Sequence, residues 1–209
     1  MSELFQPFPK IPRLNRDCVI TEKIDGTNAS VVIRSKTDPG FDEEFGDALD
    51  AVATVGDALV WAGARNGYRQ PGKGDNFGFA AWVLDNAEAL VATLGPGRHF
   101  GEWWGPGIQR GYALDMKRFS LFHPRWRAVL DGRRKGALRV PEALDVVPVL
   151  FEGLFRTSII NAVLDDLRAT GSKAAPGFKF PEGIVVFHTA ASQYFKVTLE
   201  GDEKPKGQA

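Results

Sequence analysis

A lysine, an acid and a glycine that could handle a phosphate group stand together near the start of the chain. Residues 21–28 read TEKIDGTN and follow the apolar run CVI. A strand that delivers Lys23 to a tight turn at Gly26 lets a phosphate approach both the side chain and the backbone. A lysine amine is a nucleophile only in its neutral form, which a nearby cation or partial desolvation favours. A surface lysine before an ordinary turn fits the bare Lys-x-Asp-Gly pattern equally well.

Two acids and a second lysine occupy strand boundaries further along the chain. Glu102 lies within the apolar segment FGEWWG, and it needs a partner because burying an unpaired carboxylate is costly. Glu182 directly precedes the apolar run GIVV, and Lys196 lies inside YFKV, where a lysine is unusual without an anionic partner. Each of these residues alone is explained by a salt bridge or a solvated side chain. Together with Lys23 they favour a cleft that binds phosphate and metal.

Short apolar segments bounded by Gly, Pro or Asp must position these side chains. Their content of Val, Ile, Phe and Trp predicts β-strands over 18–23, 29–35, 57–64, 98–104, 118–123, 126–130, 183–188 and 193–199. Helical spacing of apolar residues predicts one helix over 76–93 and another over 158–169. Thr157 or Ser158 is the candidate N-cap of the second helix and Gly171 its terminator. Residues 131–136, DGRRKG, are predicted to form the tip of a hairpin.

Composition limits the class of protein. The chain has 209 residues, 44% hydrophobic and 25% charged, so we expect one α+β domain over 1–200, a polar tail over 201–209 and no separate C-terminal domain. Membrane-span and secretory patterns are missing, and the single cysteine, Cys18, fits a cytoplasmic protein. The net charge of zero argues against a non-specific coat for nucleic acid. Basic residues gather over 117–139 and acids over 41–50, so a polyanion is expected to meet one face.

Six segments resemble the motifs of covalent nucleotidyltransferases, a superfamily of ATP-dependent DNA and RNA ligases and mRNA capping enzymes. EKIDGTN, ARNG, FGEWWGPGIQ, FSLF, PEGIVV and FKV follow one another in the family's order between residues 22 and 198. Asn28 and the GPGIQ segment make the chain most similar to RNA ligases of the phage T4 RNA ligase 2 type. The resemblance implies a strand-rich nucleotidyltransferase domain whose antiparallel sheets are flanked by helices.

The resemblance also implies a role for each matched residue. Lys23 is the nucleophile that becomes joined to AMP, and Lys196 contacts the α-phosphate and favours the neutral form of Lys23. The other implied roles are Glu22 and Phe122 for adenine (Phe119 if the register is shifted), Glu102 for the ribose hydroxyls, Arg65 for the phosphate or ribose, Asn28 for the reacting phosphate ends and Glu182 for the catalytic metal.

The implied function is ATP-dependent RNA ligation with ATP and Mg²⁺ (or Mn²⁺). The implied partner is RNA, including nicked duplex, or DNA ends. Thr198 stands where the family often has a second lysine and the chain ends soon afterwards, so a partner protein that supplies a missing domain is also expected. A DNA nick ligase, a polynucleotide 5′-adenylylating enzyme and a non-catalytic module that binds nucleotide or strand ends stay open. Arg133, Arg134 and Lys135 are candidate duplex contacts or a solvated turn.

Overall fold

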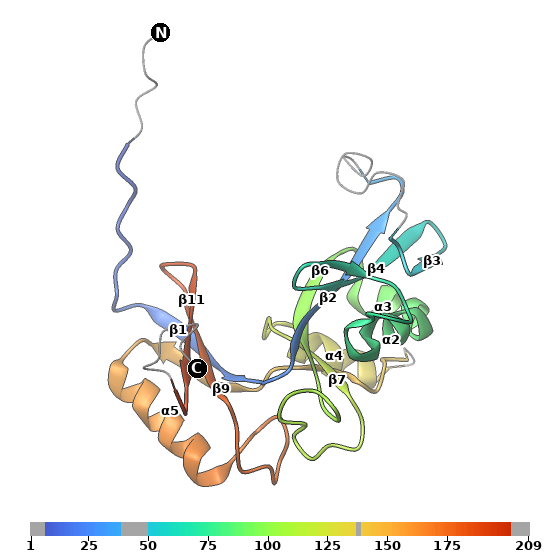
Figure 1. Cartoon of the computed structure of the whole chain (residues 1–209). Coiled ribbons are helices and arrows are strands. Elements are labelled where there is room, and N and C mark those ends of the chain that lie inside the picture. Colours follow the sequence, from blue (N-terminus) through green and yellow to red (C-terminus); the bar gives the residue numbers. More distant parts are fainter. Residues whose placement is uncertain (1–6, 39–49, 137–138, 202–209) are drawn as a thin grey trace.

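The computed structural model describes residues 7–38, 50–136 and 139–201, which form two sheets joined by the short turn 24–26 (Figure 1). The smaller sheet has the order β11-β10-β1-β9, and the larger has the order β3-β4-β2-β6-β7-β8, with β5 paired to β4. All strand pairs are antiparallel except β7 with β8. The strands are β1 (Asp17–Lys23), β2 (Thr27–Ser35), β3 (Ala53–Val55), β4 (Ala58–Ala64), β5 (Gly67–Arg69), β6 (Gly97–Trp104), β7 (Arg118–Leu121), β8 (Leu144–Val146), β9 (Val149–Leu154), β10 (Gly183–His188) and β11 (Gln193–Thr198).

Helices cover one face of each sheet and leave the other face free for the site. Against the larger sheet pack α2 (Phe79–Asp85), α3 (Ala87–Leu94) and α4 (Trp126–Arg134), through a core that joins Val31 to Phe79 and Leu130. Against the smaller sheet packs α5 (Thr157–Thr170), whose Leu164 and Leu167 meet Ile20 and Ile184. The predicted α+β class, with mainly antiparallel sheets flanked by helices, is confirmed.

The turn between β1 and β2 is held against the larger sheet. A Cβ on Gly26 would lie 2.5 Å from the Trp103 carbonyl oxygen, so only glycine allows this approach to β6. The Asp25 N–H donates to the Tyr112 hydroxyl at 2.8 Å, and Tyr112 is buried beside Ile24. The position of the Lys23 backbone is therefore fixed by packing on both sides of the turn.

The prediction of a strand over 126–130 and a hairpin tip over 131–136 is wrong, because α4 occupies most of this stretch. Trp126 and Leu130 are four residues apart, the spacing of a helical face, and both are buried against the sheet. A Cβ on Gly132 would meet nothing within 4 Å. The Asp-Gly pair that resembled a turn therefore lies on an accessible part of the helix.

The prediction of one helix over 76–93 is also wrong. The 3-10 turn η1 (Asn76–Gly78) and α2 form one arm, which meets α3 at a bend of 82°. Asn86 has non-helical backbone angles at the bend, and its side-chain amide donates to the Trp82 carbonyl at 2.8 Å, in competition with the helical ladder. The helix predicted over 158–169 corresponds to α5, which begins after Arg156 and not at Ser158, and ends before Gly171 as predicted.

Within the described residues, no single helix has the length and apolar character of a membrane span; only the bent pair 76–85 and 87–94 meets both criteria together. Of the predicted acidic segment 41–50, only Asp50 belongs to the described residues, and the tail beyond Gly201 lies outside them.

Candidate active site

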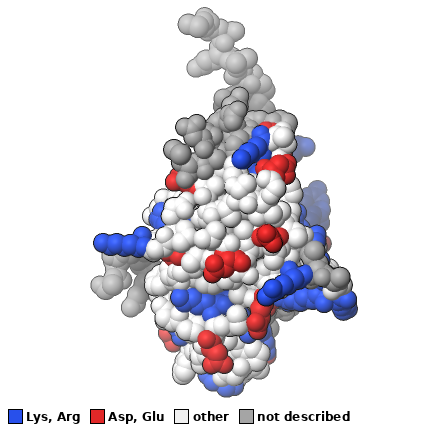
Figure 2. Space-filling view, turned by 90° about the vertical axis from the view of Figure 1, so that its right-hand side faces the viewer, with Lys and Arg blue, Asp and Glu red and all other residues white. Residues whose placement is uncertain are grey.

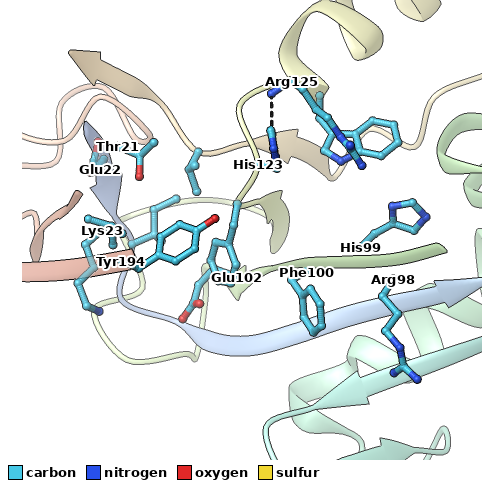
Figure 3. Close-up of a pocket in the computed structure, with 15 residues that line it drawn as sticks. Thr21, Glu22, Lys23, Arg98, His99, Phe100, Glu102, His123, Arg125 and Tyr194 are labelled. Carbon is cyan, nitrogen blue, oxygen red and sulfur yellow. Dashed lines mark hydrogen bonds between the residues drawn. The ribbon is translucent and has the colours of Figure 1, made fainter. Parts of the chain in front are cut away.

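A cavity of about 510 Å³ lies between the two sheets beside the turn (Figure 3). Both sheets contribute to its walls: Thr21, Lys23 and Val185 come from the smaller sheet, and Phe100, Glu102 and Phe122 come from β6 and the end of β7. The sequence motifs of 18–28, 98–104 and 183–188 are thus brought to one place by the pairing of β1 with β10 and of β2 with β6.

Lys23 and Glu182 form an ion pair in this region. Lys23 Nζ lies 2.6 Å from Glu182 Oε2, and the two side chains are 23% and 16% exposed. Lys23 ends β1 opposite Gly183, the first residue of β10, so the two charged groups are positioned by one strand pair. A Cβ on Gly183 would lie 2.2 Å from the Val197 carbonyl oxygen, which explains why a glycine follows the acid. The amine is held at the cavity wall, accessible to a ligand.

Glu102 reaches the same region from the other sheet. Its Oε1 accepts a hydrogen bond from the Gly26 N–H at 3.1 Å, and β2–β6 pairing places Asn28 directly opposite. Burial raises the pKa of Glu102 to about 7, while the charge of Lys23 and the Gly26 hydrogen bond oppose this rise. Residues that are directly opposite share one face of a sheet, so Asn28 and Glu102 both face the cavity side.

The raised pKa of Glu102 predicts a pH dependence of stability. The folded state holds its proton up to about pH 7, whereas the unfolded chain releases it near the ordinary value of 4.5. The folded protein therefore binds more protons between these values, and the free energy of unfolding should fall as pH rises from about 4.5 to about 7. Denaturant unfolding of the ligand-free protein in EDTA, carried out at several pH values across this range, measures the change in the free energy of unfolding. In Glu102→Gln, the part of this pH dependence that comes from Glu102 should be absent. If the free energy of unfolding falls equally steeply with pH in both proteins, Glu102 does not have the raised pKa.

Glu22 points its carboxylate away from the ligand space. It is 1% exposed and accepts hydrogen bonds from Ser172 Oγ at 2.5 Å, Lys173 N–H at 2.7 Å and Ala174 N–H at 2.9 Å. Burial raises the pKa of Glu22, and these three bonds oppose the rise. The side chain thus anchors the segment after α5 to β1, and any contact of Glu22 with a nucleotide falls to its backbone.

The two phenylalanines of the FSLF segment have different surroundings. Phe119 is fully buried, with ring centroids 5.1 Å from Phe79 and 5.8 Å from Trp82. Phe122 is 37% exposed and lines the cavity, as does Val185 from the opposite sheet. Phe122 is therefore available to a ligand in the cavity, whereas Phe119 belongs to the core.

Two predicted phosphate contacts lie outside the residues that line this cavity. Lys196 is exposed on β11 opposite Val185, and therefore on the face of the smaller sheet that carries Val185. Arg65 is exposed in the turn between β4 and β5, next to Ala64, which pairs with Ala29. Both residues flank the site, and neither reaches into the cavity.

The basic residues predicted as duplex contacts lie at the end of α4 and do not line this cavity. The Arg133 guanidinium donates to the Ala92 carbonyl at 2.7 Å, and Arg134 lies 3.9 Å from the Asp145 carboxylate. These arginines fasten α4 to α3 and β8, while Lys135 is exposed. Acidic and basic side chains are interspersed on the face shown in Figure 2, so that face carries no continuous basic surface among the described residues.

Sequence reasoning missed two groups that support the site. Arg110 Nε lies 3.0 Å from Asp25 Oδ2, which ties the GPGIQ loop to the turn after Lys23. Asn76 Oδ1 accepts from Thr27 Oγ1 at 2.9 Å, and its amide donates to the Asn28 carbonyl at 3.4 Å. Asn76 has a φ of +28°, a region that L-residues seldom adopt, and no spacing in the sequence links it to β2.

The described residues contain no group of three or more His, Cys, Asp or Glu side chains that could hold a metal by themselves. Glu182 and Glu102 are nevertheless close enough for the charge of one to raise the pKa of the other. Mg²⁺ commonly binds through one or two carboxylates together with substrate phosphates and water. The donor set therefore fits a divalent cation that arrives with a nucleotide.

Two sheets enclose a lysine-bearing cavity, with helices on their outer faces, and this arrangement matches an RNA ligase nucleotidyltransferase-like fold. The RNA ligase family profile matches residues 16–198, and the chain belongs to the RNA ligase family. No curated protein matches the chain.

Solved structures of Naegleria gruberi RNA ligase share the fold. A variant with ATP and Mn has a TM-score of 0.55 at 17% identity, over 88% of this chain and 49% of that chain. A variant with AMP and Mn has a TM-score of 0.55 at 18% identity, over 88% and 50%. The enzyme with PPi has a TM-score of 0.52 at 17% identity, also over 88% and 50%. The chain spans about half the length of these enzymes.

Proposed function

We propose that this protein is an ATP-dependent RNA ligase in which Lys23 forms a covalent bond to AMP. The observation that carries the proposal is the position of Lys23 Nζ at the wall of a cavity that also presents Glu102, Phe122 and Val185. Membership of the RNA ligase family supports it, as do relatives whose structures contain ATP, AMP or PPi with a similar fold.

The lining residues suggest how a nucleotide lies in the cavity. Adenine fits between Phe122 and Val185, the ribose hydroxyls donate to the Glu102 carboxylate, and the α-phosphate then lies toward Lys23. Asn28 faces the same side as Glu102. We assign Lys196 and Arg65 to the phosphate end from their motif positions. Glu22 contributes its backbone to the adenine side, since its carboxylate is occupied elsewhere.

The first chemical step joins Lys23 Nζ to the α-phosphorus of ATP. As this bond forms, the bond from the α-phosphorus to the bridging oxygen breaks, and its electron pair leaves with pyrophosphate. The proton lost from Nζ passes to Glu182, whose Oε2 is 2.6 Å away, or onward to solvent. A divalent cation held by Glu182 would neutralise phosphate charge. Lys196 and Arg65 would contribute positive charge near the phosphate end.

Two further transfers complete ligation. An oxygen of the RNA 5′-phosphate attacks the α-phosphorus, and Lys23 leaves as an amine that regains a proton. The 3′-hydroxyl of the other end then attacks the 5′-phosphorus, so that a phosphodiester forms and AMP leaves. The proposal also includes a partner protein that supplies a second domain. It further includes DNA ends as a second substrate beside RNA.

Covalent labelling tests the proposal. The protein is incubated with ATP labelled at the α-phosphate and Mg²⁺, then separated on a denaturing gel, with EDTA as the control. We expect label at the mass of the chain, lost when 5′-phosphorylated RNA and a 3′-hydroxyl end are added. Nucleotide binding without covalent label would favour a non-catalytic module. Parallel assays with nicked RNA duplex, nicked DNA duplex and single strands separate ligation of RNA from DNA sealing and from 5′-adenylylation alone.

A further inference from the structure

The turn η1, which precedes α2, holds three consecutive residues in the left-handed region of backbone conformation. The φ values are +28° at Asn76, +59° at Phe77 and +87° at Gly78. Glycine adopts this region freely, whereas a residue with a Cβ does so at a cost in free energy. Strained residues of this kind persist where the surrounding structure imposes them, and they cluster at ligand sites. The strain at Asn76 and Phe77 therefore points to a function at this turn.

Hydrogen bonds on both sides of the Phe77 peptide hold the strained backbone in place. Asn76 Oδ1 accepts from Thr27 Oγ1 at 2.9 Å, and the Asn76 amide donates to the Asn28 carbonyl at 3.4 Å. The Phe77 carbonyl accepts from Lys117 Nζ at 2.7 Å. The conformation is thus imposed by the Asn76 side chain and by the backbone, and none of these contacts involves the Phe77 ring.

The Phe77 ring has no packing role among the described residues. It is 53% exposed, it belongs to none of the hydrophobic core clusters there, and it contacts no other aromatic ring of the described chain. A glycine would adopt the same backbone without strain, and Gly72, Gly74 and Gly78 of the same loop already have positive φ. A phenylalanine at this position therefore destabilises the fold while its ring stays available to a ligand.

The ring lines a surface hollow of about 570 Å³, a volume typical of small-ligand sites. The loop 72–78 forms this hollow through Gly72, Gly74, Asp75, Asn76, Phe77 and Gly78. A Cβ on Gly72 or Gly74 would meet nothing within 4 Å, so the space above both glycines is open. The Asp75 carboxylate is buried and accepts from the N–H groups of Ala80 and Ala81, so it faces α2.

A positive charge lies beside the ring. Lys117 Nζ is held at the Phe77 carbonyl, 3.9 Å from the position that a Cβ on Gly78 would take, and it forms no ion pair within the described part of the chain. Proteins bind unpaired nucleic acid with exposed aromatic rings that stack on bases and with cations that contact the phosphates. An unpaired nucleotide is therefore the ligand that fits the hollow.

The hollow lies near the reacting groups of the proposed ligase. Thr27, which bonds to Asn76, is four residues from Lys23, so the Cα atoms of Thr27 and Lys23 are at most about 15 Å apart. Nucleotides follow one another at about 3.4 Å along a stacked strand. A strand that ends at Lys23 can therefore place at the hollow a base within about six nucleotides of that end.

We propose that the hollow at Phe77 binds one unpaired nucleobase of the RNA substrate, close to the end that is joined. The base stacks on the Phe77 ring, and Lys117 contacts an adjacent phosphate. The identity of the strand as substrate rests on the proposed ligase function, whereas the stacking contact rests on the hollow alone.

Phe77→Gly distinguishes a role in binding from a role in folding. It removes the ring and the left-handed strain together, so the Tm should be unchanged or higher by about 2 °C. Phe77→Tyr keeps both the ring and the strain and should unfold as the wild type does. Thermal unfolding measures the three proteins. A Tm of Phe77→Gly several degrees below that of the wild type would show that the ring supports the fold, and would overturn the proposal.

Binding of a fluorescent, 5′-phosphorylated oligoribonucleotide, measured by anisotropy in EDTA, tests the stacking contact. Phe77→Gly should bind about tenfold more weakly than the wild type, which is the loss typical of one stacked base, and Phe77→Tyr should keep the affinity. The matched control is Phe195→Ala, which removes an equally exposed phenylalanine (54%) from the α5 side of β11 and should bind as the wild type does. The same Kd for the wild type and Phe77→Gly overturns the proposal.

Oligonucleotides with a single abasic site locate the stacked base. The abasic site is moved through the six nucleotides next to each end of the strand. At one position it should weaken binding to the wild type by about tenfold and leave binding to Phe77→Gly unchanged, because both changes remove the same contact. If the losses from the abasic site and from Phe77→Gly add at every position, no base stacks on Phe77.

Covalent labelling by ATP separates failure of this inference from failure of the proposed function. Phe77 does not line the cavity beside Lys23, so the wild type and Phe77→Gly should label equally. Equal label with an unchanged Kd overturns the base site and leaves the ligase proposal intact. Absence of label in the wild type, together with the expected loss of RNA affinity, overturns the ligase proposal and leaves the base site. Loss of label in Phe77→Gly alone would assign the ring to the ATP site and overturn the base site.

Discussion

Lys23→Ala should show no covalent AMP after incubation with α-labelled ATP and Mg²⁺. Lys23 supplies the only amine among the described residues that line the cavity, and the cavity's arginines remain protonated and are poor nucleophiles. Steps that pass through enzyme-AMP should therefore stop. An RNA strand that already carries 5′-AMP bypasses the missing amine, so the variant should still join it slowly to a 3′-hydroxyl end.

Lys23→Arg is the matched control for loss of folding. Arginine keeps the positive charge beside Glu182, so the ion pair that is 2.6 Å long in the wild type can re-form. This variant should unfold at a similar denaturant concentration to the wild type and still carry no label. Label on either variant equal to that on the wild type would remove Lys23 from the role of nucleophile.

Gly26→Ala should destabilise the protein and disrupt the site at once. The added Cβ would lie 2.5 Å from the Trp103 carbonyl oxygen, 2.7 Å from Trp104 Cβ and 2.9 Å from Glu102 Cγ. These atoms belong to a paired strand and cannot simply rotate away, so we expect a loss of about 3 kcal/mol in the free energy of unfolding. The same shift should break the hydrogen bond from Gly26 N–H to Glu102 and reduce covalent labelling by ATP.

Gly132→Ala is the control for this substitution. It lies in α4, where a Cβ meets nothing within 4 Å, so alanine should raise the free energy of unfolding by about 0.5–1 kcal/mol. Denaturant unfolding and covalent labelling by ATP, carried out on both variants, compare their stability and their reaction with ATP. A Gly26→Ala protein as stable and as readily labelled as the wild type would show that the turn tolerates a side chain.

Strands that carry the motifs could be predicted because their apolar runs are long and end at glycine or a charged residue. The four that were missed, β3, β5, β8 and β9, are short or lie at a sheet edge. None of the six residues of β9 is buried, and its pairing with β1 joins residues more than 120 positions apart. Such a strand is stabilised by its neighbour more than by its own sequence. The error over 126–136 arose because a helix on a sheet needs only a few buried residues, here Trp126 and Leu130.

The reactive side chains of the candidate site could be predicted from the sequence. The residues that hold them in position through hydrogen bonds could not. Lys23, Glu102 and Glu182 stand out because charged side chains interrupt apolar strands. The bonds from Glu22 to the segment after α5, and from Asn76 to β2, join distant segments and leave no periodic signal. Arg98 and Phe100 share the two-residue period of Glu102, a signal that would have placed them on the same face.

The residues of the candidate site are divided between the two sheets, and the link between the sheets determines their relative positions. Lys23 and Glu182 belong to neighbouring strands of one sheet, while Glu102 and Phe122 belong to the other, and residues 24–26 form the link between β1 and β2. Because Ile24 is buried and Gly26 is packed against β6, this link fixes the position of the amine relative to Glu102 as well as to Glu182. The lysine and both carboxylates are therefore held in position in the ligand-free protein, and a nucleotide that binds does not have to bring the two sheets together.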